Sequence, residues 1–475
     1  MTERTLTAAP VDPAPPRARS GLVLAIILTC QLMLVLDVTV MNVALPRIQS
    51  DLHFTPTGLS WVMSAYTLIF GCLLLLGGRA GDLFGRRRMF VIGVAVFTLA
   101  SLAGGLAQSA AWLVIARIVQ GLGAAAAGPS TLALISSTIS EPKARIRALA
   151  LFSAMSSGGF AVGLIVGGLL TEWGSWRLVM FINVPFGIAV TVLALKFITE
   201  PERHPAKLDL PGALTSTLGV AGLVYAFIRA ATVGWGDPLV LVTMIGGVLL
   251  LGLFVVLERR AAQPLVRLSL LSEGNRARAY LNFFLGPMAM TAMFFFLTQF
   301  IQDVLGLKPL ATGFAFLPMA AMMFGISRIV PRLLPRFGAK PLAVTGSALM
   351  VLGLVWLTRL DVSSGYFDSL FGPLLLMGTG AGLGFAPLNV IIMSTVPARD
   401  AGAAGGVLQT MQQVGGSLGL AVLVTVFGRV SATAIADHES AAQVLVSGMT
   451  SAYVVAAVVA LAAFVVALTF RREPV

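Results

Sequence analysis

The sequence predicts an all-α polytopic membrane protein with fourteen transmembrane helices. Hydrophobic residues make up 57% of the 475 residues and charged residues only 11%, a balance unlike that of soluble globular chains. Apolar runs long enough to cross a bilayer recur from one end of the sequence to the other. These runs lack the two-residue alternation of barrel strands, so their backbone hydrogen bonds must be satisfied within helices.

The chain opens with a segment that is not expected to fold. Residues 1–19 are rich in Pro and are predicted to form a disordered cytoplasmic tail. The apolar run that follows is too long for a signal-peptide core, so we expect it to be retained as the first span. The fourteen spans are expected at residues 20–45, 58–78, 87–108, 111–137, 146–170, 176–198, 209–230, 238–257, 279–302, 310–330, 340–358, 368–395, 402–428 and 447–470.

The Lys and Arg residues orient these spans. With a cytoplasmic N-terminus, one basic residue, Arg117, lies inside a span, and six lie at outer ends: Arg47, Arg177, Arg229, Lys308, Arg359 and Arg429. The other 25 of the 32 then fall on the cytoplasmic side. This positive-inside bias predicts a plasma-membrane protein with both termini cytoplasmic. It also assigns the net charge of +12 to the membrane surface rather than to nucleic acid.

An internal repeat predicts the domain organisation. The segment 151–168 resembles the segment 407–424, with Met and two Gly residues aligned at a spacing of 256 residues. Duplicated halves of a transporter place a substrate site between them, near the middle of the membrane. We therefore expect an N-terminal six-helix bundle at residues 20–198, an inserted helix pair with its linkers at 199–278, and a C-terminal bundle with a short tail at 279–475.

One carboxylate lies deep in the first span. Asp37 is part of the segment LDVTVMNVALP, which ends at Pro46. An acid at that depth costs roughly 2.5–3.5 kcal/mol on insertion scales, so a proton or substrate pathway is the favoured interpretation. A packed polar residue satisfied by neighbouring backbone is the alternative. Measured back from Pro46, Asp37 is about 14 Å from the outer end of its helix.

One guanidinium lies deep in the fourth span. Arg117 is part of LVIARIVQGLGAAAAGP and cannot easily lose its proton, so it needs a carboxylate, carbonyl groups or water. It is about 10 Å from the outer end of its span, at a depth that makes contact with Asp37 plausible. Proton coupling is the favoured interpretation, and a structural buried pair is the alternative. The segment around Gly378, aligned with it in the second half, has no Arg.

Two glycine-rich segments also contain candidate functional residues. In GGRAGDLFGRRRM, Asp82 can cap the third helix or pair with a cation, and Gly78, Gly85 and Arg86 stand beside it. In GFAVGLIVGG, small residues recur every four positions, which permits close helix contact. The glycines of that segment are Gly159, Gly163, Gly167 and Gly168.

These four segments resemble those of the major facilitator superfamily, and more closely those of its fourteen-helix drug:proton antiporters. The resemblance implies two six-helix bundles plus two inserted helices, alternating access, and protons as the coupling ion with no cofactor. It implies proton coupling at Asp37 and Arg117 and a gating motif at Gly78, Asp82, Gly85 and Arg86. Ala80 replaces the usual Leu, and Leu164 replaces the Pro of the antiporter motif. Pro335 occupies the acid position in the second half.

The expected substrate is an amphipathic or weakly cationic organic compound such as a drug or antibiotic. Candidate cavity residues are the hydroxyl and amide side chains Thr39, Asn42, Gln120, Gln299, Asn389 and Gln409. Polar residues of this kind also join helices, so packing is an equal alternative for each. An exporter of one endogenous metabolite would have the same features.

Other classes of protein fit less well. Residues 415–419 read GGSLG, as in a nucleophile elbow, but that motif needs a strand and a histidine base, and no predicted span contains His. The two cysteines, Cys30 and Cys72, lie in apolar runs and suggest neither a disulfide nor a metal site. A channel or receptor without coupled transport remains an alternative. We expect a non-enzymatic transporter that works as a monomer in the lipid bilayer.

Overall fold

The computed structural model describes residues 17–139, 141–200, 209–261, 264–266, 270, 273–394, 396 and 401–471. Over these residues every regular element is a helix. Residues 1–16 of the expected disordered tail lie outside the described residues, and Arg17 already belongs to the first helix.

The helices follow the predicted order. The N-terminal half contains α1 (Arg17–Leu52), α2 (Ser60–Phe84), α3 (Arg86–Gly105), α4 (Ala110–Thr138), α5 (Pro142–Trp173), α6 (Trp176–Phe181) and α7 (Asn183–Phe197). The inserted pair is α8 (Leu210–Val233) and α9 (Pro238–Arg260). The C-terminal half contains α10 (Gly274–Gln299), η2 (Phe300–Val304), α11 (Pro309–Ala315), α12 (Leu317–Phe337), α13 (Ala339–Leu357), η3 (Tyr366–Leu370), α14 (Phe371–Ser394), α15 (Ala401–Ala436) and α16 (Ala441–Leu468).

The predicted fold class is confirmed. Thirteen helical segments in the described part of the chain are long and apolar enough to cross a membrane. The remaining predicted span is α5, whose described apolar portion is Gly158–Trp173. Two of the thirteen are interrupted: α6 and α7 form one span, and α11 and α12 form another.

The first span is longer than predicted. Pro46 does not end α1, which continues to Leu52. Proline lacks the N–H that would bond four residues back, so it leaves a backbone carbonyl without its helical donor. The carbonyl that Pro46 frees is that of Asn42; on the next residue, the Val43 carbonyl accepts from Gln302 of η2 over 2.9 Å. Helices within a membrane tolerate proline where neighbouring groups or local adjustments satisfy the freed backbone.

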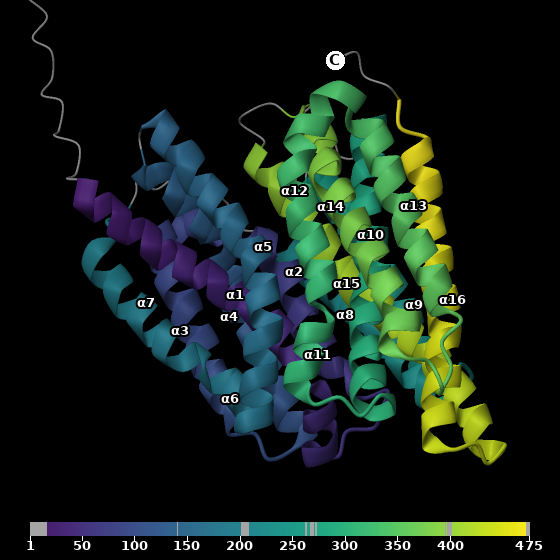
Figure 1. The fold of residues 1–475 in the computed structure, drawn as a ribbon. Helices are drawn as coiled ribbons and strands as arrows, with labels where there is room; N and C mark the ends of the chain where they lie inside the picture. The colour runs from purple at the N-terminus through teal and green to yellow at the C-terminus, as the bar shows by residue number, and fades with distance from the viewer. Residues whose placement is uncertain are drawn as a thin grey trace, which may run out of the picture.

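The two halves lie side by side, and the inserted pair packs against the contact between them. Figure 1 shows α1–α7 on one side and α10–α16 on the other. Helix α8 packs against α2 and α15, the helices that join the halves, while α9 packs mainly against α8. Helix α1 begins and α16 ends at the same end of the bundle, here called the terminal end, and the opposite end is called the distal end (Figure 1).

Glycines bring α5 close to α1 and to the C-terminal half. A Cβ atom added at Gly167 would lie 2.8 Å from the Val40 Cα of α1, and one at Gly163 would collide with the Thr39 side chain. On the next residue, a Cβ atom at Gly168 would lie 2.6 Å from the Leu310 Cα of α11. The small-residue pattern of α5 therefore serves helix contact on two faces.

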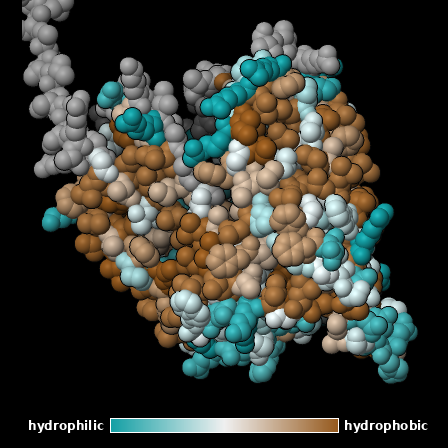
Figure 2. All heavy atoms as spheres, viewed as in Figure 1, coloured by the Kyte–Doolittle hydropathy of each residue, from teal (hydrophilic) through white to brown (hydrophobic). Residues whose placement is uncertain are grey.

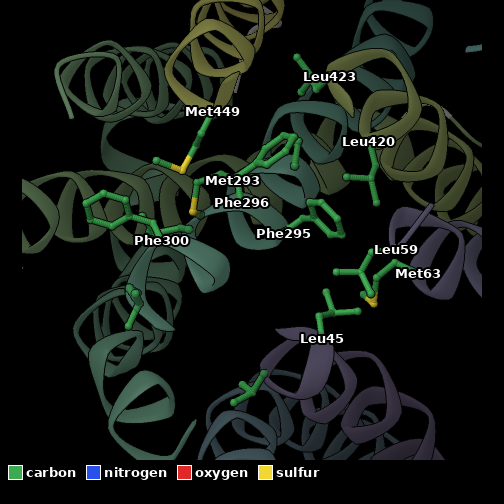
Figure 3. Close-up of a cluster of buried hydrophobic side chains, with 14 of the residues drawn as sticks. Leu45, Leu59, Met63, Met293, Phe295, Phe296, Phe300, Leu420, Leu423 and Met449 are labelled. Carbon is green, nitrogen blue, oxygen red and sulfur yellow. The ribbon is translucent and has the colours of Figure 1, made fainter. Parts of the chain in front are cut away.

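A hydrophobic cluster closes the distal end. Figure 3 shows Leu45, Leu59 and Met63 from the N-terminal half facing side chains from the C-terminal half. The labelled side chains from the C-terminal half are Met293, Phe295, Phe296, Phe300, Leu420, Leu423 and Met449. We call this the distal cluster. Towards the terminal end the halves have largely separate cores, apart from leucines of α2 that reach the C-terminal one. The structure is therefore sealed at the distal end.

Polar contacts reinforce the distal seal. Asn42 of α1 donates to the Thr298 hydroxyl of α10 over 3.2 Å. The backbone N–H of Leu310 in α11 donates to the Glu172 carboxylate of α5 over 3.0 Å. Each contact joins one half to the other, so the seal combines apolar burial with directed hydrogen bonds.

The outer surface suits a lipid environment. Figure 2 shows hydrophobic side chains over the middle of the visible face and hydrophilic ones gathered at its two ends. Large apolar side chains such as Leu99 and Leu249 are about two-thirds exposed, at 66% and 67%. Such exposure is unfavourable in water and ordinary against lipid tails. The chain is a multi-pass membrane protein.

Candidate functional site

A buried ion pair lies inside the N-terminal half. Arg117 Nη1 of α4 donates to Asp37 Oδ2 of α1 over 2.5 Å, and both side chains are fully buried. An isolated buried charge would be very costly, so each of these charges depends on the other. The structure thus brings together the two residues that the sequence marks as proton-coupling candidates.

Amide side chains complete the environment of the carboxylate. Asp37 Oδ1 accepts hydrogen bonds from Gln120 Nε2 over 3.1 Å and from Asn183 Nδ2 over 3.2 Å. Gln120 Nε2 also donates to the Ser101 hydroxyl over 2.7 Å. The network therefore joins α1, α3, α4 and α7. Asp37 thus accepts three hydrogen bonds, one of them from a guanidinium.

The guanidinium has partners besides Asp37. Its Nε donates to the Val62 carbonyl over 2.9 Å, and its Nη1 donates to Gln120 Oε1 over 2.9 Å. Its centre lies 4.4 Å from the centroid of the Tyr66 ring, a cation–π contact. Arg117 thus has three further partners besides the carboxylate. Its Nη2 and the Tyr66 hydroxyl are buried without a hydrogen-bond partner in the described structure.

The pair lies directly behind the distal cluster. Val40 and Met41 of α1 belong to that cluster, and Leu36 and Val38 pack against it. Because α1 continues to Leu52, Asp37 is fifteen residues, or roughly 22 Å, from the end of its helix. Asp37 thus lies near the middle of α1, deeper than the estimate from Pro46 implies. Opening of the distal cluster would bring water towards it.

The loop between α2 and α3 is tied within the N-terminal half. Arg86 Nη2 bonds Asp82 Oδ1 over 3.0 Å, so Asp82 pairs with a cation and does not cap α3. The cap is Glu200, which accepts from the backbone N–H groups of Arg87 and Arg88 over 3.1 and 3.2 Å. Gly85 has a φ of 108°, which favours glycine.

The remaining residue of that loop segment, Gly78, has only loose surroundings. A Cβ atom added there would lie 3.6 Å from the Pro129 side chain of α4, an ordinary contact. Arg79, next to it, donates to the Pro264 carbonyl over 3.4 Å and so connects α2 to the segment after α9.

The predicted cavity residues are scattered. Gln120 is buried in the Asp37 network, and Asn42 joins α1 to α10. Thr39 donates to the Leu36 carbonyl over 3.1 Å. Gln299 donates to the Phe295 carbonyl over 3.1 Å, also within its own helix. These four serve local bonding or helix contact.

Two of the predicted cavity residues are at least partly exposed. Asn389 of α14 is exposed and Gln409 of α15 is half-buried, and neither has a hydrogen bond within the described structure. The structure does not unite the six candidates in one site.

The sequence interpretation missed several partners in the network. Asn183 follows the apolar run WRLVMFI and, like Asp37, is a polar residue within a predicted span. This feature could have identified it as a candidate. Tyr66 and Ser101 carried no such signal, because hydroxyl side chains in spans usually bond their own helix. Only the packing of α2, α3 and α4 shows that they face Arg117 and Gln120.

Comparisons with known proteins agree with this architecture. The family model described as "Major Facilitator Superfamily" matches residues 27–420. A solved structure of a bacterial homologue of the human lysosomal transporter Spinster, inward-facing and unoccupied, superposes with a TM-score of 0.70 at 17% identity. That likeness covers 97% of this chain and 100% of the other, and it supports the fold.

Curated relatives are more similar in sequence. The puromycin resistance protein pur8 of Streptomyces alboniger is 41% identical over 95% of this chain and 91% of its own length. The cephamycin export protein CmcT of Amycolatopsis lactamdurans is 41% identical over 86% of this chain and 85% of its own. The multidrug resistance protein Stp of Mycobacterium tuberculosis is 36% identical over 86% and 75%. The chain belongs to the major facilitator superfamily of membrane transporters.

Proposed function

We propose that the protein exports amphipathic organic compounds, antibiotics among them, in exchange for protons. Export is by alternating access across the plasma membrane, with the terminal end in the cytoplasm. The observation that carries the proposal is the buried Asp37–Arg117 pair behind the distal cluster. The relatives whose names describe puromycin resistance and cephamycin export support the substrate class.

Asp37 is the proton-accepting group in this proposal. When the distal cluster opens, water and a proton reach the carboxylate from outside. Protonation removes its charge, and Arg117 keeps the Val62 carbonyl, the Gln120 amide oxygen and the Tyr66 ring as partners. The guanidinium therefore stays in place while Asp37 is neutral. Return to the distally sealed state restores the ion pair and releases the proton to the cytoplasm.

The distal cluster is the outer gate of this cycle. It contains side chains from both halves, so the halves must separate there before the outside can reach the centre. The bonds Asn42–Thr298 and Leu310–Glu172 must break in the same step. A substrate enters from the terminal end while the distal cluster is closed, and leaves when it is open.

A susceptibility panel tests the substrate class. Cells lacking their own exporters would express the wild-type chain, Asp37→Asn, or the control Asp361→Asn, which changes an exposed loop residue. We expect the wild type and the control to raise tolerance of puromycin and other amphipathic antibiotics. Asp37→Asn should give none, although it reaches the membrane in equal amount. Normal tolerance in the Asp37→Asn cells would contradict the role of Asp37.

Reconstitution tests the coupling. Purified protein in proteoliposomes with an imposed pH gradient should move a labelled antibiotic against its own gradient, and a protonophore should stop this. Movement only down the substrate gradient would indicate a channel. Uphill movement of one cellular metabolite, with no antibiotic moved, would indicate a dedicated metabolite exporter.

A further inference from the structure

A second buried carboxylate lies far from the Asp37 network. Among the described residues two acidic side chains are buried, Asp37 at 1% exposure and Glu258 at 3%. Asp37 is paired with Arg117, whereas Glu258, near the end of α9, has no cation within salt-bridge distance in the described part of the chain. Its Oε2 accepts from the backbone N–H of Val266 over 3.1 Å, and its Oε1 has no partner there.

The group that faces Glu258 is another acid. Asp209 caps α8, where its Oδ1 accepts from the Gly212 N–H over 2.9 Å. Within the described structure its Oδ2 is buried and unpartnered, like Oε1 of Glu258. A Cβ atom added at Gly212 would lie 2.7 Å from Asp209 Oδ2 and 2.8 Å from Glu258 Oε1. The two unpartnered oxygens therefore face the same point beside Gly212.

Among the described residues, no nearby cation neutralises this pair. The charged side chains on the surrounding elements bind or face other groups: Arg79 of α2 donates to the Pro264 carbonyl, Arg276 of α10 donates to the Leu270 carbonyl, and Arg259 and Arg260 of α9 are exposed. Two adjacent carboxylates in a buried setting repel each other and cannot both stay ionised cheaply. One proton placed between Oε1 and Oδ2 satisfies both unpartnered oxygens.

We propose that Glu258 and Asp209 share one proton and form a second proton-binding site, separate from Asp37, at the terminal end of the inserted pair. The shared proton forms a hydrogen bond between Glu258, near the end of α9, and Asp209, at the start of α8. Glu258 also holds the backbone of Val266, so the site fixes the segment that follows α9.

That segment connects the inserted pair to both halves. Leu265, Val266 and Leu270 are buried in the core of the C-terminal half, together with Ala213 of α8 and Tyr280 of α10. Arg79 of α2 reaches the same segment from the N-terminal half. Loss of the shared proton leaves two repelling carboxylates and loosens this junction. The site thus makes the terminal end sensitive to alkaline conditions.

The direction of the pH effect follows from linkage. The folded dyad keeps a proton that the unfolded chain loses near the ordinary carboxyl range, at about pH 4. The folded state therefore binds more protons, and its stability falls as the pH rises until the dyad ionises. In Glu258→Gln the amide replaces the protonated carboxyl, donates to Asp209 and removes this dependence.

Two measurements on the purified full-length protein test the proposal, and neither requires transport. The first is infrared difference spectroscopy at neutral pH. The wild type should show the C=O stretch of a protonated carboxyl group that Glu258→Gln and Asp209→Asn lack and the control Glu439→Gln keeps. Glu439 is exposed, and Asn still caps a helix at position 209. Identical spectra for all four proteins would overturn the shared proton.

The second measurement is the thermal midpoint as a function of pH. Relative to Glu258→Gln, the wild type should lose a few degrees between pH 5 and pH 9, on the order expected for one linked proton. The Glu439→Gln control should follow the wild type. A difference that does not vary with pH would overturn the proposal. So would stabilisation of the wild type, but not of Glu258→Gln, by added Na⁺ or Ca²⁺ at constant pH, because it would assign the site to a metal ion.

Discussion

The two halves share a helix arrangement but fill their interiors differently. In the N-terminal half, Asp37 and Arg117 form a fully buried ion pair. In the C-terminal half, Met293 stands 256 residues after Asp37, and Gly378 is aligned with Arg117. Met293 is wholly buried in the distal cluster, and a Cβ atom at Gly378 would collide with the backbone of Met319. At these matched positions one half holds a buried ion pair, and the other holds packed, uncharged residues.

This difference shows that repeated architecture does not require repeated chemistry. A proton site needs one carboxylate whose partners can be rearranged. A second copy would add another buried charge with its own desolvation cost of several kcal/mol. Close contact between α12 and α14 at Gly378 leaves no volume for an arginine there. At these positions the C-terminal half supplies apolar side chains to the distal cluster, and the following experiments test that division.

Removal of the buried cation should have the largest effect. Arg117→Met leaves Asp37 charged and unpaired, which should destabilise the protein by about 3–5 kcal/mol. Thermal unfolding of the purified variant would measure this loss. The double variant Asp37→Asn with Arg117→Met removes both charges and should regain most of the stability, although it should not export. Equal instability of the single and double variants would argue that packing, not charge, dominates this site.

Matched substitutions of one buried amide in each half should differ in their effect on stability, by less than the Arg117 variants do. Asn183→Leu removes a hydrogen bond to a charged carboxylate and should cost about 1.5–3 kcal/mol. Gln299→Leu removes a bond within its own helix and should be close to neutral. Thermal midpoints of the two variants would be compared. A larger loss for Gln299→Leu would reverse the expected contrast.

Two glycines of α14 test the packing of the C-terminal half. Gly378→Ala forces a methyl group against the Met319 backbone and should cost about 1–3 kcal/mol, with reduced yield. Gly384→Ala is the control, because a Cβ atom there meets no atom within 4 Å. Yield and thermal midpoint after identical purification would distinguish them. Similar behaviour of the two variants would show that α12 and α14 can move apart cheaply.

The contact between α5 and α11 should give the smallest effect. Glu172→Gln removes the negative charge beside the start of α11 and near Lys308, whose Nζ lies 4.0 Å away. Loss of this favourable charge should weaken distal closure by about 0.3–1 kcal/mol. Thiol labelling of Phe295→Cys, a position in the distal cluster, should become several-fold faster in the Glu172→Gln background. Unchanged labelling would show that the apolar contacts alone keep the gate shut.

Much of the fold could be predicted because membrane spans are recognisable as long apolar runs in the sequence. Fourteen apolar runs and the placement of Lys and Arg suffice for the helix count, since backbone groups in lipid must bond within helices. The details that depend on neighbours could not be predicted. Helix α1 continues past Pro46, and beside this proline the Val43 carbonyl accepts from Gln302 of the other half, a donor that no local signal in α1 predicts.

The candidate site divides in the same way. Asp37 and Arg117 stand out because deep charges are rare in spans. Whether an amide or hydroxyl lines a cavity, joins helices or bonds its own helix depends on which faces meet. For Asn42 and Gln120 the sequence leaves the substrate cavity and helix contact as equal alternatives, and the structure places both in contacts between helices. Glu258 escaped notice because it stands beside Arg259 and Arg260, which suggest a solvated helix end.

The glycine contacts between the halves have a kinetic consequence. At Gly168 and Gly313 the backbones of α5 and α11 touch without side chains between them. Packed side chains that interlock must change rotamer before two helices can shift, and this raises the activation barrier. Bare backbone surfaces can shift past each other without that step. Turnover of the transporter should therefore be limited by the separation of the interlocked Met and Phe side chains in the distal cluster, and not by the movement of α5 past α11.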